Sequence, residues 1–198
     1  MIVTDIDIVG LTDFEKLLKK VPDETRKAAS MAINTTAKRA RTAGAKEIRN
    51  QVNLRAKYVN DNLTVTRSAS RNDLRAVING RARPVMLHRY VTGWASRSKG
   101  RRRGARVSVK RGGASRSLSR TFEMKLNSGN MAIVMRTDGG EPDAAYKPRR
   151  LFAGRDDLWV LYSPSVDQLF KTVKDDIAPD MSKFVAKEFK RHIARFVK

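Results

Sequence analysis

The feature that most limits what this chain can fold into is a long stretch without acidic residues. Between Asp73 and Glu123, 49 residues contain no Asp or Glu but carry 14 Lys and Arg residues. Because the stretch itself offers these cations no acidic residue to pair with, we expect them to face solvent or a negatively charged partner. The stretch supplies 14 of the 22 net positive charges of the 198-residue chain. We therefore expect a polyanionic or acidic partner.

The densest part of this stretch, residues 95–120, is also rich in Gly and Ser, which predicts a mobile loop. Arg outnumbers Lys by twelve to two in the acid-free stretch, and the guanidinium fork holds two phosphate oxygens at once. The loop lacks aromatic residues for base stacking, so we expect sequence-independent, salt-sensitive binding. The residues predicted to face DNA or an acidic partner are Arg97, Lys99, Arg101, Arg102, Arg103, Arg106, Lys110, Arg111, Arg116 and Arg120.

The N-terminal quarter of the chain has helical patterns. Residues 2–9 are strand-like, and Thr12 with Glu15 forms a capping box that opens a short helix. Pro22 is then suited to the first turn of a long helix ending near Gln51. A shorter helix is predicted near residues 54–59. The long helix is expected to bury a narrow stripe of mostly small residues at helical spacing, namely Ala29, Ile33, Ala37, Ala40, Gly44 and Ile48.

The rest of the chain alternates as strands do before it ends in helices. We predict strands at residues 63–66 and 74–80, a hairpin of 121–126 with 131–136, and a strand at 158–162. A helix over 166–177 should break at Pro179 and restart near residue 181. The last helix has a strong apolar stripe, which we predict to be an assembly interface formed by Met181, Phe184, Val185, Phe189, Ile193 and Phe196.

These elements predict an α+β fold. A long N-terminal helix and a C-terminal amphipathic helix would pack on a small, mostly antiparallel sheet that carries the long basic loop. No second change in composition marks another domain, so we expect one domain over residues 1–198, with residues 95–120 inserted in it as the loop. The sequence has neither an apolar run of about 18 residues nor a signal-peptide pattern, so we expect no membrane contact.

Enzyme chemistry has little support in the sequence. The chain has no Cys and only two His residues, His88 and His192, which argues against a zinc site and a thiolate nucleophile. No nucleophile-elbow or phosphate-binding glycine motif occurs. Neighbouring carboxylates diverge on a helix or strand and seldom bind one ion; the pairs are Glu141 with Asp143, Asp156 with Asp157, and Asp175 with Asp176. We expect no enzyme, no metal, no cofactor and no small-molecule substrate.

Two alternatives of other classes stay open. A general nucleic-acid-binding protein would explain the charge equally well, and its free monomer would bind duplex with a steep salt dependence. A metal-dependent nuclease is a more distant alternative. It would cleave DNA with magnesium and lose this activity when Asp156 or Asp157 is replaced.

Several segments resemble one family in order along the chain. They are the run Lys27-Ala-Ala-Ser-Met-Ala-Ile-Asn-Thr-Thr-Ala, its continuation Ala43-Gly-Ala-Lys-Glu-Ile-Arg, the basic middle of the chain, Phe122-Glu-Met-Lys-Leu-Asn-Ser-Gly, and a C-terminal helix with a basic end. Together they resemble the minor tail protein Z family of tailed bacteriophages and prophages, also called tail completion protein.

The resemblance implies a non-enzymatic virion protein in the neck or the head-proximal tail, assembled in the host cytoplasm. Its neighbours would be the tail terminator, the connector or other neck proteins. It implies a homo-oligomer, expected to be a hexameric ring around the double-stranded DNA, that joins tail to connector and helps hold the genome end ready for ejection.

Overall fold

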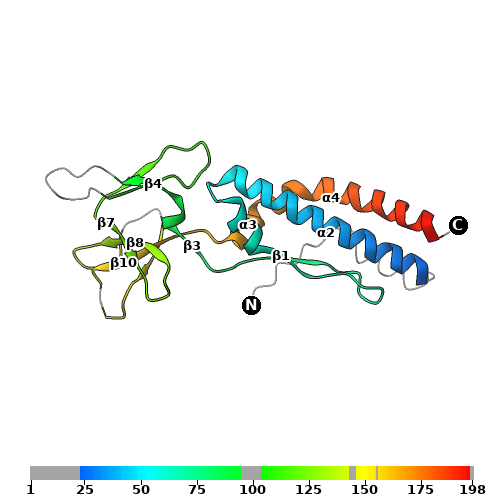
Figure 1. Cartoon of the computed structure of the whole chain (residues 1–198), viewed down its shortest axis with the longest axis horizontal. Helices are drawn as coiled ribbons and strands as arrows, with labels where there is room; N and C mark the ends of the chain where they lie inside the picture. The colour runs from blue at the N-terminus through cyan, green and yellow to red at the C-terminus, as the bar shows by residue number, and fades with distance from the viewer. Residues whose placement is uncertain (1–22, 95–103, 143–145, 155, 197–198) are drawn as a thin grey trace. The chain divides into compact units, whose positions relative to one another are not determined.

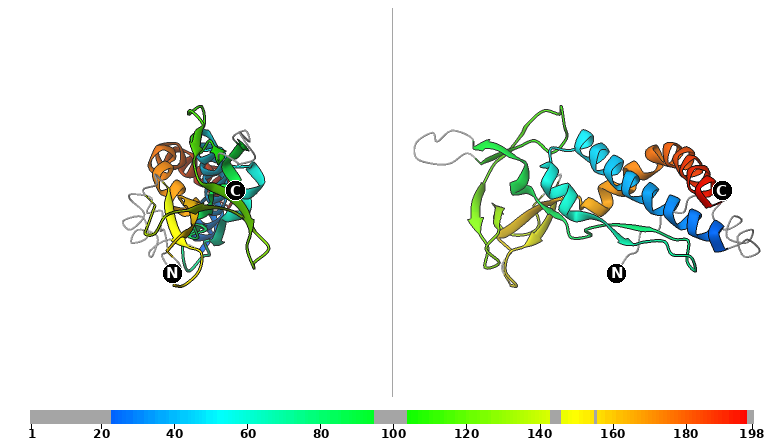
Figure 2. Two further views of the ribbon diagram at one scale, coloured as in Figure 1. Left: turned by 90° about the vertical axis from the view of Figure 1, so that its left-hand side faces the viewer. Right: turned by 45° about the vertical axis from the view of Figure 1, so that its right-hand side comes forward.

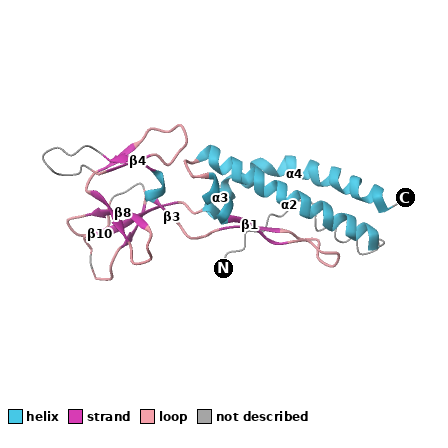
Figure 3. Ribbon diagram, in the orientation of Figure 1, coloured by secondary structure: helices cyan, strands magenta, loops and turns pink. Residues whose placement is uncertain are grey.

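The structure is a computed structural model of the whole chain, and it describes residues 23–94, 104–142, 146–154 and 156–196. These residues form two compact units. The first contains residues 23–48, 56–82 and 166–196, and the second contains residues 49–55 and the described part of 83–165. The first unit is dominated by long helices and the second by strands (Figure 3). This architecture confirms the predicted α+β class, whereas the strand and helix predicted before residue 22 lie outside the described residues.

Two long helices, α2 (Asp23–Gln51) and α4 (Val166–Phe196), lie side by side in the first unit (Figure 1). Near one end of α2, a Cβ on Gly44 would lie 2.5 Å from the ring of Phe170. Toward the other end, Ile33 belongs to a buried cluster against which Val185 and Phe189 pack. The start of α2 therefore packs beside the end of α4, so the helices are antiparallel, as a second view also shows (Figure 2). The small residues of the predicted stripe allow this close approach.

A two-stranded arm completes the first unit. After the short helix α3 (Ala56–Asn62), β1 (Leu63–Arg67) pairs antiparallel with β2 (Val77–Gly80). The amide of Asn34 on α2 donates to the carbonyl of Ala69 at 2.9 Å, and its oxygen accepts from the backbone N–H of Ala69 at 2.7 Å. Both strand predictions are confirmed, although the second strand begins at Val77 because buried Leu74 belongs to the turn that packs on α2.

The predicted break at Pro179 is wrong. Helix α4 continues without interruption from Val166 to Phe196 with Pro179 inside it. A proline within a helix removes one backbone hydrogen bond and clashes with the preceding turn. Pro179 lies on the exposed side, whereas Val173 before it and Met181 after it are buried. Because both halves of the helix bury apolar side chains in the same unit, packing holds the helix together across the proline.

The larger sheet of the second unit has five strands. They are β3 (Val85–Met86), β7 (Thr121–Lys125), β8 (Met131–Arg136), β9 (Lys147–Arg150) and β10 (Leu158–Ser163). All pairings are antiparallel, and β10 lies between β8 on one side and β9 on the other, because Trp159 pairs with residues of both. The predicted β7–β8 hairpin and the predicted strand at 158–162 are confirmed.

A three-stranded sheet follows the short 3-10 helix η1 (Leu87–Tyr90). Its strands are β4 (Val91–Trp94), β5 (Ala105–Val107) and β6 (Arg116–Leu118), in that order. Residues 104–120, which we predicted to be part of a mobile loop, therefore contain a β5–β6 hairpin. Ala105 and Val107 are buried while Arg106 is exposed, the alternation expected of a half-buried strand. Residues 95–103 of the predicted loop lie outside the described residues.

Candidate interaction surfaces

The β5–β6 hairpin presents three cations to solvent, Arg106, Lys110 and Arg116. Within the described part of the chain, no carboxylate lies within ion-pair distance of any of them. In the strand register, Arg106 lies opposite Ser117 and Arg116 lies opposite Val107. The side chains of the two arginines therefore project from opposite faces of the hairpin. The hairpin can therefore offer positive charge on both faces.

Two further predicted cations are engaged within the second unit. The backbone N–H of Arg111 donates to the carbonyl of Gln51 at 3.0 Å, and its guanidinium donates to the carbonyl of Arg49 at 3.0 Å. These bonds satisfy carbonyl groups at the end of α2 that have no partner within the helix. Arg120 forms an ion pair with Asp138, which raises the pKa of the guanidinium by hydrogen bonding and by charge. The remaining predicted cations lie outside the described residues, namely Arg97, Lys99, Arg101, Arg102 and Arg103.

The predicted assembly stripe on α4 lies partly within the first unit. Met181 is buried, and Val185 and Phe189 pack against the buried cluster formed with α2. The guanidinium of Arg39 lies 4.2 Å from the ring centre of Phe184, and the ammonium of Lys27 lies 5.0 Å from that of Phe196. Ile193 is half-buried. Contacts with α2 thus occupy much of the stripe, and its role between subunits stays a prediction.

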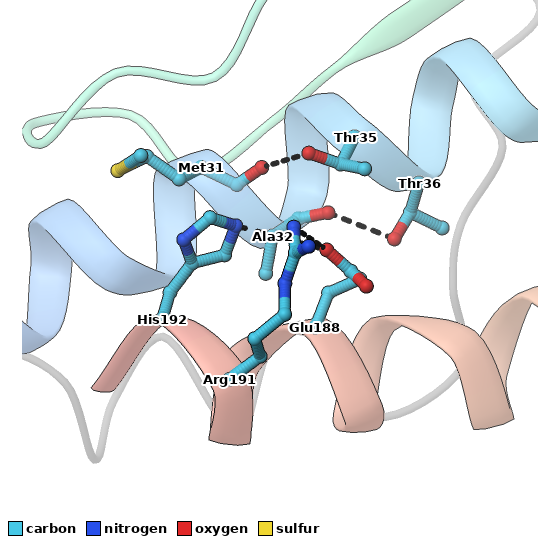
Figure 4. Close-up of polar contacts among 7 residues, drawn as sticks. All are labelled: Met31, Ala32, Thr35, Thr36, Glu188, Arg191 and His192. Atoms are coloured by element: carbon cyan, nitrogen blue, oxygen red, sulfur yellow. Dashed lines mark hydrogen bonds and ion pairs between the residues drawn. The ribbon is translucent and has the colours of Figure 1, made fainter. Parts of the chain in front are cut away.

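A buried polar cluster lies between α2 and α4 (Figure 4). Glu188 is 5% exposed and forms an ion pair with Arg191. His192 is 4% exposed, its Nε2 lies 3.7 Å from the Glu188 carboxylate, and neither ring nitrogen has a hydrogen-bond partner among the described residues. The Thr36 hydroxyl donates to the Ala32 carbonyl at 2.8 Å instead. Burial, followed by the charge of Arg191, lowers the pKa of His192, and the charge of Glu188 opposes this effect.

The histidines and carboxylates considered above for catalysis or metal binding are mostly engaged in structural contacts or exposed to solvent. His88 Nε2 lies 2.6 Å from Glu123, and both side chains are half-buried in the second unit. Asp156 forms an ion pair of 3.1 Å with Arg150. Asp175 and Asp176 are exposed neighbours on α4. In the described ranges, no three His, Asp or Glu side chains come together as a metal site would require.

Arginines stacked on aromatic rings were not predicted from the sequence. The Arg136 guanidinium lies 5.8 Å from the ring centre of Phe122, and that of Arg149 lies 5.6 Å from the ring centre of Tyr162. Both arginines lie beyond the acid-free stretch, where the density of positive charge is lower. Neither strand has a local pattern that indicates these contacts, because the ring partners depend on strand pairing.

Comparison with known proteins decides the family. A family model described as prophage minor tail protein Z matches residues 8–198, nearly the whole chain. The chain belongs to the prophage minor tail protein Z family. This assignment confirms the resemblance seen in the sequence and makes the chain a structural component of a phage tail. Searches among curated proteins and solved structures found no match. No described helix is long and apolar enough to cross a membrane.

Proposed function

We propose that this minor tail protein is a non-enzymatic ring subunit in the neck or the head-proximal tail. The ring joins the tail to the connector and helps hold the genome end through the basic segment of residues 97–120. Membership of the minor tail protein Z family supports the structural role and a place among other virion proteins. Tail terminator, connector and neck proteins are the proposed neighbours, in a virion assembled in the host cytoplasm.

The observation that carries the proposal is the set of exposed hairpin cations Arg106, Lys110 and Arg116, which have no carboxylate partner among the described residues. Cations of this kind bind phosphate by releasing counterions, without reading the base sequence. They need no cofactor and no small-molecule substrate.

A ring multiplies this contact. Six copies around a DNA path would bring together about 84 positive charges from the acid-free stretches. Each contact with a phosphate is weak and salt-sensitive, but many contacts held in one assembly act at a high effective concentration. We therefore expect the free subunit to bind DNA weakly and the assembled ring to hold it firmly.

The test uses virions that carry R106Q/K110Q/R116Q. The matched control is K38Q/K46Q/K183Q, which removes three exposed cations of the first unit. We expect both proteins to fold and enter virions, and we expect only the hairpin variant to reduce the fraction of particles that deliver their genome. Normal genome delivery by the hairpin variant would contradict the proposal. Folding is checked by circular dichroism, and incorporation by protein analysis of purified particles.

A general nucleic-acid-binding protein is the second candidate, because a net charge of +22 favours binding to any polyanion. The two proposals differ in where tight binding occurs. Tight, salt-sensitive duplex binding by the free monomer, with no gain on assembly, would favour the second candidate.

A further inference from the structure

One face of the five-stranded sheet carries exposed cations around a buried apolar cluster, to which Val134 and Val160 belong. Phe122, Val134, Val160 and Arg149 form one row across β7, β8, β10 and β9. Residues two apart on a strand share a face. Arg136, two positions beyond Val134, and Lys147, two positions before Arg149, therefore lie on the same face as this row.

Two of these cations are held against aromatic rings. Arg136 lies over Phe122 and Arg149 lies over Tyr162, at 5.8 and 5.6 Å from the ring centres. A ring beneath a guanidinium restricts its rotamers and leaves the N–H groups at its edge available to an acceptor. A guanidinium in this position can donate to two oxygens of an anionic acceptor such as a phosphate diester.

The cations of this face differ from their neighbours in the same sheet. Arg120, just before β7, is paired with Asp138, and Arg150, which lies 5.6 Å from the ring centre of Trp159, is paired with Asp156. In contrast, Arg136, Lys147 and Arg149 are exposed, and no described carboxylate lies within ion-pair distance of them. Carboxylates thus neutralise Arg120 and Arg150, whereas Arg136, Lys147 and Arg149 stay available to an anionic partner.

Protection of a sheet edge explains only part of this pattern. Lys147 and Pro148 lie on β9, and both residue types discourage an edge strand from pairing with another chain. Arg136 lies on β8, which is flanked by β7 and β10 and has no free edge there. Protection of the edge therefore accounts for Lys147 and not for Arg136, whose side chain covers Phe122 of the apolar cluster while its charged end stays exposed.

The stacked arginines are far enough apart to contact separate phosphates. Strands β8 and β9 are separated by β10, and the two arginines are offset by two residues along the strands. Strand geometry then places their Cα atoms about 12 Å apart. Successive nucleotides of one DNA strand rise by only about 3.4 Å along the axis, so this separation spans more than one nucleotide. Each guanidinium can thus reach a different phosphate of one strand.

We propose that Arg136, Lys147 and Arg149 form a second DNA-binding surface, which contacts the phosphate backbone of double-stranded DNA. This inference rests on the proposed function, because it takes DNA as the partner. It adds residues beyond the acid-free stretch and on a different sheet from the β5–β6 hairpin. The hairpin and the sheet face are expected to contribute separate phosphate contacts.

The experiment measures binding of the purified full chain to a fluorescent duplex of about 30 bp between about 50 and 200 mM NaCl. Four proteins are compared: the unmodified chain, the sheet variant R136Q/K147Q/R149Q, the hairpin variant R106Q/K110Q/R116Q, and the control K38Q/K46Q/K183Q. Each phosphate contact contributes about 0.9 to the slope of log K against log salt concentration. The sheet variant should lower the slope by about 2.7, whereas the control should leave it nearly unchanged.

The outcomes separate this inference from the proposed function. An unchanged slope in the sheet variant, with a lower slope in the hairpin variant, overturns the second surface and leaves the proposed function standing. A lower slope in the sheet variant alone supports the second surface and contradicts the proposed role of the hairpin. Unchanged slopes in both variants overturn both.

A conservative variant and a different polyanion test the chemistry. R136K/R149K keeps the charges but loses the planar fork, so we expect it to keep the slope and bind the duplex several-fold more weakly. Equal affinity of R136K/R149K would contradict the role of the stacked guanidinium groups. Polyglutamate of matched charge is the second probe. If the sheet variant weakened binding to polyglutamate but not to the duplex, the surface would belong to an acidic protein, and the proposal would be overturned.

Discussion

At the scale of single residues, close approach of two backbones explains a glycine that the sequence pattern leaves unexplained. Gly80 is the last residue of β2, and a Cβ there would lie 2.6 Å from the Cα of Asp167 at the start of α4. The backbone N–H of Asp167 also donates to the carbonyl of Arg81 at 3.3 Å. Only glycine allows this contact without displacement of the backbone.

Replacing Gly80 tests this contact. We expect Gly80→Ala to lower the free energy of unfolding by about 1–3 kcal/mol, because the neighbouring atoms are backbone and cannot rotate away. Gly93→Ala is the matched control: Gly93 lies in strand β4, and a Cβ there would meet nothing within 4 Å. It should be neutral or stabilising by up to about 1 kcal/mol. Urea unfolding measures the free energy of unfolding of both variants. Equal values would show that the space beside Gly80 can accommodate a Cβ atom.

At the scale of elements, the α2–α4 pair combines apolar packing with a polar cluster that is incompletely satisfied. Val185 and Phe189 pack against the cluster that contains Ala29 and Ile33, while buried His192 has no hydrogen-bond partner in the described ranges for either ring nitrogen. A buried polar group without a partner costs stability. Arg191, Glu188 and Arg195 are the charged groups of α4 that act on the imidazole, and the α2 residues drawn around it in Figure 4 are uncharged.

The lowered pKa of His192 predicts how this helix pair responds to pH. The unfolded chain binds a proton near the ordinary value of 6.5, whereas the folded chain binds it only at lower pH. Stability linked to this group is therefore complete above about pH 6.5 and falls as the pH drops through the lowered pKa. His192→Leu should lose less stability than the unmodified chain between about pH 7.5 and 5. Urea unfolding across this range is the measurement, and parallel pH profiles would contradict the prediction.

Elements with strong local signals could be predicted from the sequence. Helix α2 has its small-residue stripe and acidic first turn, and the β7–β8 hairpin has alternating strands around Asn127-Ser-Gly-Asn. Strands β5 and β6 could not be predicted, because each has three residues and is stabilised by pairing with residues distant in sequence. The continuity of α4 through Pro179 likewise depends on packing against α2, which local propensity does not report.

The candidate surfaces were only partly predictable for the same reason. Charge density alone identified Arg106, Lys110 and Arg116 as exposed cations. It could not show that Arg111 caps α2 or that Arg120 pairs with Asp138, because these contacts join residues 18 to 62 positions apart. The stacked Arg136 and Arg149 depend on strand register in the same way.

At the scale of the whole molecule, the excess of positive charge is the dominant property. A chain with a net charge of +22 repels itself when compact, and this repulsion is relieved by an anionic partner. The described cations on the β5–β6 hairpin and on the sheet face are exposed where such a partner could reach them. Membership of the prophage minor tail protein Z family gives the chain a place in a phage tail.

The most direct test of this account is photo-crosslinking in mature virions, with a benzophenone amino acid in place of Arg116. The same substitution at Lys46, an exposed cation of α2, is the control. The account predicts crosslinks from position 116 to the viral DNA, with far fewer from position 46. Crosslinks from position 116 to protein alone would contradict the claim that the basic segment holds the genome end.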